Sequence, residues 1–196
     1  DFYIDYDKLK KLLRDDGYDE ENGWTEDDEG AFVEELVNVQ LEKVHAFQSE
    51  TYQKLRDRTS KCEAKLDPVV ISATGDIEQE DEQDGEAESS VKNKPAPSDE
   101  EKDKIVKEVL DELDSITKEI NELEKYSRIN YTGFLKAAKK HDRRRGHAYR
   151  VRPLLQVRLA ALPFNKEDYS PLLYRLPAMY SFVRQNLEGK DRRGLS

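Results

Sequence analysis

The feature that most constrains this chain is an apolar stripe at helical spacing, which no Pro or Gly interrupts between Ala31 and Asp67. It consists of Phe32, Val33, Leu36, Val37, Leu41, Val44, Phe47, Tyr52 and Leu55. Residues that recur three or four positions apart lie on one face of a helix. Thr25 is the expected N-cap, because acidic residues follow it in the first turn. About 40 helical residues span roughly 60 Å, which is too long for a compact four-helix bundle and predicts a helical hairpin.

A second apolar seam supplies the partner for this helix. Ser98 and Glu101 have the spacing of a capping box, in which each side chain bonds the backbone N–H of the other residue. A heptad-like seam then follows at Ile105, Val109, Leu113, Ile116, Ile120 and Leu123. We expect the two helices to pair antiparallel, and such a pair alone is typical of a coiled-coil interaction protein.

Residues 67–97 are expected to form a disordered acidic linker inside a single domain that spans residues 1–196. Pro68 is expected to end the first long helix. The run over residues 76–88 has almost no apolar content, so burial cannot offset the entropy lost on ordering it. The alternative is that this acidic run competes with an anion for a basic site.

The other patterns are helical as well, and no strand pattern occurs in the sequence. Residues 2–14 predict a short N-terminal helix. Pro153 suits the first turn of a helix that Pro163 ends, and Ser170 opens the last helix. The predicted fold is therefore all-α, with a long antiparallel two-helix hairpin, a shorter N-terminal helix, a basic short helix and two C-terminal helices packed as a bundle.

Charge is distributed unevenly along the chain. The net charge is −10, yet residues 126–196 hold 16 Lys and Arg against 5 Asp and Glu, a net of +11, and residues 1–125 carry −21. This segregation indicates a local anion site rather than a nucleic-acid-binding protein.

Metal and disulfide chemistry find little support in the sequence. The single cysteine, Cys62, excludes an intrachain disulfide and a cysteine-based zinc site, and it fits a reducing compartment. His45 lacks a second ligand at metal-binding spacing, so we interpret it as structural. We expect neither a metal nor another cofactor, and the sequence contains no signal peptide or transmembrane run.

The basic stretch over residues 128–145 carries the strongest functional signal. If a helix begins near Thr132, one face carries four cations, namely Lys136, Lys139, Lys140 and Arg143. The opposite face carries groups that can pack on a neighbour: Phe134, Ala137, Ala138 and His141. Like charges at this spacing repel by roughly 0.2–0.5 kcal/mol per pair, so a polyanionic partner explains the face. A solvated basic face is the open alternative.

Two motifs about 120 residues apart carry a family resemblance. The first is Tyr3-Ile-Asp-Tyr-Asp-Lys-Leu-Lys10. The second is Asn130-Tyr-Thr-Gly-Phe-Leu-Lys-Ala-Ala-Lys-Lys-His-Asp-Arg143. Together they resemble an SPX domain, the inositol-pyrophosphate sensor of eukaryotic phosphate homeostasis. Shorter matches at residues 32–36, 155–159 and 170–175 narrow the resemblance. With them, the chain is similar to the N-terminal domain of regulatory subunits in the fungal vacuolar transporter chaperone complex, a membrane polyphosphate polymerase.

The resemblance implies a ligand site. It assigns one phosphate to Tyr6, Lys10 and Lys140, although alone Tyr6 also suits a half-buried core position and Lys10 a solvated one. It assigns a second cluster to Lys136, Lys139 and Arg143, where many members of the family have Lys in place of the arginine. It also implies a further helix before Asp1, whose first lysine joins the cluster.

The expected function is therefore a sensor, not an enzyme. The expected ligands are inositol pyrophosphates, inositol hexakisphosphate, or phosphate and sulfate anions. The expected partners are other subunits of the complex on the cytosolic face of the vacuolar membrane, with this fragment soluble and contact with the membrane only through other parts of the protein. A helical scaffold without a ligand is the main alternative. A nucleic-acid binder fits less well, and His141 and His147 lack catalytic partners in the sequence.

Overall fold

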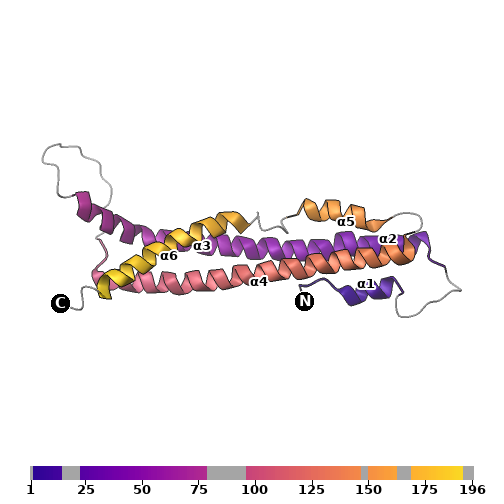
Figure 1. Ribbon diagram of the computed structural model, residues 1–196, viewed down its shortest axis with the longest axis horizontal. Coiled ribbons are helices and arrows are strands. Elements are labelled where there is room, and N and C mark those ends of the chain that lie inside the picture. Colours follow the sequence, from indigo (N-terminus) through magenta and orange to yellow (C-terminus); the bar gives the residue numbers. More distant parts are fainter. Residues whose placement is uncertain (1, 15–22, 79–95, 147–149, 163–168, 192–196) are drawn as a thin grey trace. The chain divides into compact units, whose positions relative to one another are not determined.

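The computed structural model describes residues 2–14, 23–78, 96–146, 150–162 and 169–191 (Figure 1). Every regular element in these ranges is helical. In chain order they are α1 (Tyr6–Leu12), α2 (Glu26–Val33), the π-helical segment η1 (Glu34–Gln40), α3 (Leu41–Glu78), α4 (Asp99–Arg145), α5 (Val151–Ala160) and α6 (Ser170–Asp191). The predicted all-α class with its long helical hairpin is confirmed. His147, Pro163 and most of the predicted linker lie outside the described residues.

The first apolar stripe folds as α2, η1 and α3 in direct succession. Thr25 caps α2 as predicted: its hydroxyl accepts from the Asp28 N–H at 3.2 Å, and the Asp28 carboxylate accepts from the Thr25 N–H at 2.9 Å. The π-helical turn adds a residue per turn and so rotates the stripe locally. Phe32 before this segment, Leu36 within it and Val44 after it are fully buried.

Pro68 does not end the long helix, contrary to the prediction, because α3 continues to Glu78. Proline has no N–H to donate to the backbone carbonyl four residues earlier. Ala64, which carries that carbonyl, and Pro68 are both exposed, so the carbonyl can bond to water. The Ser72 hydroxyl donates to the Pro68 carbonyl at 2.8 Å, while Leu66 and Val69 keep the stripe buried at 4% and 2% exposure. Side-chain burial therefore outweighs the lost backbone hydrogen bond.

α4 is one continuous helix, so the basic stretch is its C-terminal part and not a helix that begins near Thr132. The predicted capping box is present: the Ser98 N–H donates to Glu101 at 2.9 Å, and the Glu101 N–H donates to the Ser98 hydroxyl at 3.3 Å. Gly133 lies inside the helix, where an added Cβ would come within 2.9 Å of Ile4 Cγ2. The glycine therefore permits close contact with the N-terminal segment.

α1 is shorter than the helix predicted over residues 2–14. The Ile4 N–H donates to Asn130 Oδ1 at 2.7 Å, and the Asp5 N–H donates to Gln40 Oε1 at 2.8 Å. Because side chains from two other helices satisfy these donors, the residues before α1 do not need helical hydrogen bonds.

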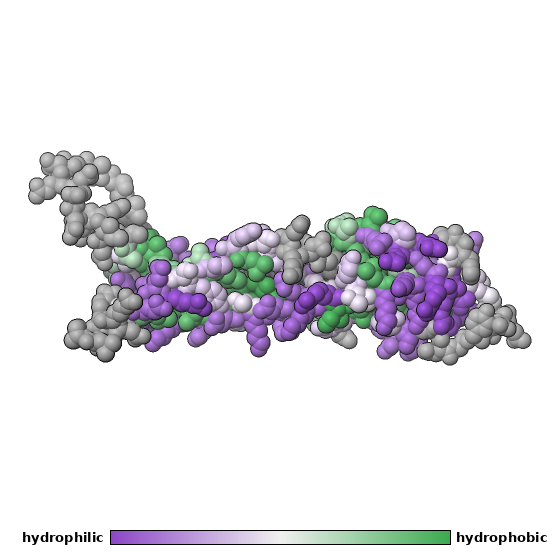
Figure 2. Space-filling model, in the orientation of Figure 1, coloured by the Kyte–Doolittle hydropathy of each residue, from purple (hydrophilic) through white to green (hydrophobic). Residues whose placement is uncertain are grey.

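The chain forms two compact units, and α3 and α4 each contribute to both. Unit 1 comprises Asp1–Lys54 with Glu119–Ser170, and unit 2 comprises Leu55–Lys118 with Pro171–Ser196. In unit 1 the ring centroids of Phe47 on α3 and Tyr126 on α4 are 4.9 Å apart. The face drawn in Figure 2 is largely hydrophilic, with apolar patches between the charged side chains.

Unit 2 is cross-linked by ion pairs. Arg58 on α3 contacts Glu112 on α4 at 2.6 Å, and Arg175 on α6 contacts Glu63 on α3 at 2.7 Å. Hydrogen bonds from the arginines lower the pKa of both glutamates. Cys62 is buried, and burial raises the pKa of its thiol. Lys65 on α3 contacts Glu108 on α4 at 3.4 Å, so the residue number rises along α3 from Arg58 as it falls along α4 from Glu112, which confirms the antiparallel pairing in unit 2.

Candidate functional site

The N-terminal segment lies along the second motif of α4. The Tyr126 hydroxyl donates to the Phe2 carbonyl at 2.6 Å. One turn further along α4, Asn130 accepts from the Ile4 N–H and donates to the Tyr126 carbonyl at 2.7 Å. Gly133 then makes room for the Ile4 side chain. The order of these contacts shows that the two segments run parallel.

The same parallel order continues through α1. The Lys136 ammonium lies over the Tyr6 ring, 5.1 Å from its centroid. At the other end of α1, the Leu13 carbonyl accepts from the Arg145 guanidinium at 3.5 Å. The two motifs recognised in the sequence are therefore adjacent in the fold, and Tyr6 and Lys136 are in direct contact.

The register brings the remaining predicted residues to the same stretch. Lys10 follows Tyr6 by one helical turn and precedes Leu13. Lys139 and Lys140 follow Lys136 on α4 and precede Arg145. Lys10 and the two lysines of α4 therefore occupy the interval between the two contacts just described.

The cationic face of α4 is open to solvent, whereas its opposite face is buried. Lys136, Lys139 and Arg143 are exposed, and Tyr6, Lys10 and Lys140 are half-buried. The predicted packing face is confirmed, because no residue in it is more than 1% exposed: Phe134, Ala137, Ala138 and His141. Within the part of the chain that the structure describes, Lys10, Lys139 and Arg143 form no ion pair with an acid.

The side of α1 that faces η1 forms an ion pair. The Lys8 ammonium lies 3.0 Å from Glu35, whose carboxylate also accepts from the Gln40 amide at 2.7 Å. Glu35 and Gln40 both lie on the π-helical segment η1, and the Gln40 side chain also accepts from the Asp5 N–H. Burial by itself would raise the pKa of Glu35, but the hydrogen bonds from Gln40 and Lys8 and the charge of Lys8 together lower it.

Glu35→Gln is expected to destabilise unit 1 at neutral pH by about 1 kcal/mol, the usual upper range for a partly exposed ion pair. The folded-state pKa is lowered from 4.5, so this stabilisation is present above that value and is lost as pH falls through the lowered pKa. Thermal melts of both proteins between pH 7 and pH 3 should converge in acid. Glu50→Gln, in an exposed pair with Lys54, is the control. A difference at pH 3 as large as at pH 7 would contradict the assignment.

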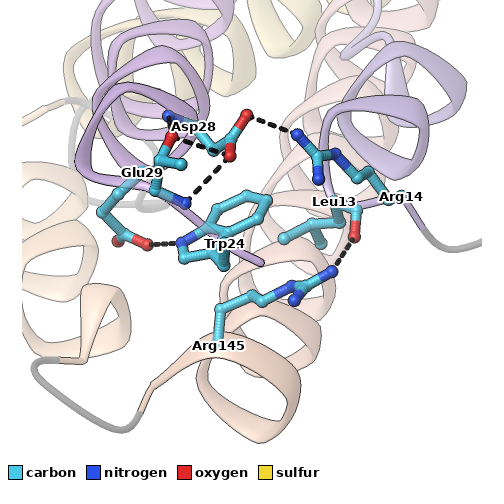
Figure 3. A network of polar contacts seen from close by, with 7 residues as sticks. Leu13, Arg14, Trp24, Asp28, Glu29 and Arg145 are labelled. Carbon is cyan, nitrogen blue, oxygen red and sulfur yellow. Dashed lines mark hydrogen bonds and ion pairs between the residues drawn. The ribbon is translucent and has the colours of Figure 1, made fainter. Parts of the chain in front are cut away.

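A polar network fixes the end of α1 against α2 (Figure 3). The Arg14 guanidinium contacts Asp28 at 2.8 Å. Hydrogen bonds from Thr25 and, to a smaller extent, the charge of Arg14 lower the pKa of Asp28. The Arg145 guanidinium lies 4.6 Å from the centre of the Trp24 ring, as a cation–π contact.

His141 is the centre of a buried network that the sequence did not reveal. Its Nε2 lies 2.6 Å from Glu29, which also accepts from the Trp24 indole N–H at 2.6 Å, and its Nδ1 lies 2.9 Å from Asp142. The imidazole stacks on Phe32 with 5.0 Å between ring centroids. Both ring nitrogens of His141 therefore contact carboxylate oxygens.

Asp142 extends this network to α5. Its carboxylate accepts from the Val151 N–H at 2.7 Å and from the Arg152 N–H at 3.1 Å, which caps the helix in place of Arg150. His141 has no exposed surface, so in this structure it positions helices and is not accessible from solvent. No group of three or more potential metal ligands occurs among the described residues.

Comparisons with known proteins identify relatives that match most of this chain. The chain is 36% identical over 189 residues to vacuolar transporter chaperone complex subunit 2 of Saccharomyces cerevisiae, and the match covers 94% of this chain and 19% of that protein. The chain is homologous to vacuolar transporter chaperone subunits. Subunit 4 of Schizosaccharomyces pombe is 35% identical over 182 residues, which cover 93% of this chain and 22% of the relative. Subunit 2 of that yeast is 36% identical over 187 residues, which cover 95% of this chain and 22% of the relative.

The predicted similarity to vacuolar transporter chaperone subunits is thus confirmed. The chain spans about a fifth of the length of these relatives. No protein-family model matches it. Within the described ranges, none of the helices has the length and apolar character needed to cross a membrane.

Proposed function

We propose that unit 1 binds inositol pyrophosphates and related multivalent phosphate anions. The proposed site consists of Tyr6, Lys10, Lys136, Lys139, Lys140 and Arg143. The observation that carries this proposal is the contact between Tyr6 and Lys136, because it joins two motifs that are far apart in sequence. A cationic face at that junction allows side chains from both helices to contact one polyanion.

The electrostatics of the surrounding residues support the proposal. The nearby acids Glu35 and Asp28 pair with Lys8 and Arg14, on the side of α1 that packs against η1 and α2. The buried Glu29 and the half-buried Asp142 are used by the His141 network. Lys10, Lys139 and Arg143 therefore keep their mutual repulsion, which a bound polyanion would relieve.

The side chains suit phosphate oxygens. The Tyr6 hydroxyl can donate a directed hydrogen bond, the lysine ammonium groups can donate charge-assisted ones, and Arg143 presents a planar fork. Hydrogen bonds to charged groups contribute roughly 1.5–3 kcal/mol each. A ligand with several phosphates engages several of these groups together, and its affinity should fall with rising salt.

The homology to vacuolar transporter chaperone subunits supports a role for the chain in such a complex. We propose that the chain is part of a regulatory subunit of a polyphosphate polymerase complex, on the cytosolic side of the vacuolar membrane. Bound anion would change the charge of the α1–α4 surface and thereby its contacts with neighbouring subunits. Such linkage makes anion binding a regulator of the complex.

A helical scaffold without a ligand is the second candidate. The antiparallel pairing of α3 and α4, with ion pairs such as Arg58–Glu112, favours it because it is the arrangement of coiled-coil interaction proteins. A scaffold of this kind needs no saturable anion site, so direct binding measurements separate the two functions.

Calorimetric titration with inositol hexakisphosphate tests the proposal. Lys140→Ala should weaken binding by more than about 1 kcal/mol, the contribution of one charge-assisted contact. Lys118→Ala, an exposed lysine of the same helix in unit 2, is the matched control and should bind as the wild type does. Equal affinities for the two variants would remove Lys140 from the site and favour the scaffold.

Gly133→Leu should weaken the same binding about tenfold or more without removing any charge, because two or more contacts depend on the position of α1. The larger side chain would collide with Ile4, where even a Cβ comes within 2.9 Å of Cγ2. α1 would then move away from α4 with Tyr6 and Lys10. Gly30→Leu is the control, since nothing lies within 4 Å of a Cβ at Gly30. Unchanged affinity in Gly133→Leu would show that α1 does not contribute to the site.

A further inference from the structure

A pocket of about 330 Å³ opens in unit 1 at residues that the proposed anion site does not use. Four aromatic side chains and two carboxylates line it: Phe2, Tyr3, Phe47, Tyr126, Glu119 and Glu122. This volume is at the small end of the range for binding pockets. Its chemistry is opposite to that of the anion site, because the charged groups in its wall are acids.

The aromatic wall is built from contacts between three segments. Phe2 stacks on Phe47 of α3 with 4.4 Å between ring centroids, and Tyr3 lies 4.9 Å from Tyr126 of α4. The Tyr126 hydroxyl donates to the Phe2 carbonyl, so its polar atom is already satisfied. Phe2 and Tyr3 nevertheless keep 58% and 43% of their surface exposed. The wall is therefore firmly held and still presents aromatic surface to solvent.

The acids come from successive turns of α4. Glu119 and Glu122 are three residues apart and exposed, and both line the pocket. Glu122 lies 3.3 Å from Lys125 in an exposed pair, and such pairs are weak enough to exchange for another cation. Aromatic rings beside carboxylates attract a cation with an apolar stem and repel phosphate.

We propose that this pocket binds a lysine or arginine side chain that is flanked by apolar residues in a segment of a partner protein. The aliphatic stem would pack on the rings, and the cationic head would reach Glu119 and Glu122. The exposed outer surface of Phe2 and Tyr3 accommodates the flanking apolar residues. Charge complementarity selects this occupant over an acidic or neutral peptide, and the proposal is independent of the anion site.

Peptide titrations observed by NMR on the chain test this proposal. The probes are acetyl-Leu-Lys-Leu-amide, the same peptide with norleucine in place of lysine, and the same peptide with glutamate. The lysine peptide should shift the aromatic resonances of the pocket and bind about fivefold or more tightly than the norleucine peptide. The glutamate peptide should bind most weakly. Equal affinities for all three would overturn the proposal.

Two variants locate the effect. The double variant Glu119→Gln, Glu122→Gln should remove the preference for lysine over norleucine, and Tyr3→Leu should weaken the lysine peptide while it preserves apolar bulk. The double variant Glu100→Gln, Asp111→Asn makes the same charge change at exposed positions of α4 outside the pocket and should have no effect. Full retention of the preference in the first variant would contradict the proposal. Self-association that Tyr3→Leu abolishes would assign the pocket to a second copy of the chain and would also overturn it.

Discussion

His141→Ala is expected to lower the free energy of unfolding of the unit that contains it by about 3–5 kcal/mol, the usual cost of removing the partner of a buried carboxylate. The substitution leaves Glu29 and Asp142 without the imidazole that both contact, at 2.6 Å and 2.9 Å. It also leaves a cavity against Phe32. Chemical denaturation followed by circular dichroism measures the loss.

The single tryptophan supplies a local readout of this change. Trp24 donates to Glu29, so its fluorescence should report the loss of the network before global unfolding. His45→Ala is the matched control, because His45 is only half-buried and its ring nitrogen lies 3.5 Å from the Ser49 hydroxyl. If the two variants lose equal stability, the His141 network does not stabilise unit 1.

The triple variant Lys10→Ala, Lys139→Ala, Lys140→Ala should reduce affinity for inositol hexakisphosphate by about 100-fold or more, since several charge-assisted contacts are lost together. No residue in this set belongs to the buried face of α4. The helical circular dichroism signal should therefore stay at the wild-type level. Competition against a fluorescent inositol phosphate at constant salt measures the change in affinity.

A second triple variant separates the effect of losing the site from the effect of a lower net charge. It combines three substitutions, Lys104→Ala, Lys107→Ala and Lys118→Ala. They remove the same number of positive charges, but from exposed positions of α4 in unit 2. This variant should bind nearly as the wild type does. A comparable loss of affinity in both variants would mean that the anion responds to overall charge and not to the α1–α4 junction.

Local rules were sufficient to predict most of the fold. Capping boxes at Thr25 and Ser98 and the helical apolar stripes depend on residues close together in sequence. The predicted helix end at Pro68 and the predicted helix start near Thr132 were wrong. Buried side chains on either side of each position keep the helix continuous, although the local sequence favours a break. The prediction was also wrong for residues 2–5, because their hydrogen-bond partners lie on other helices and no local pattern reveals them.

The candidate site was likewise predicted in part from local sequence patterns. The cationic face of α4 follows from helical spacing, and the family motifs predicted that Tyr6 belongs with it. The His141 network was missed because Glu29 is 112 residues away and is one of several acids in the first turn of α2. The close approach that Gly133 permits at Ile4 also depends on tertiary structure, as does the aromatic pocket.

The location of the anion site can be measured directly by NMR. Backbone amides of the isotope-labelled chain are titrated with inositol hexakisphosphate, and the shift of each resonance is followed to saturation. We expect the largest saturable shifts in α1 and at residues 136–143 of α4, with little change at residues 99–118. Saturable shifts centred on residues 99–118, or no saturable shift at all, would contradict the proposed site.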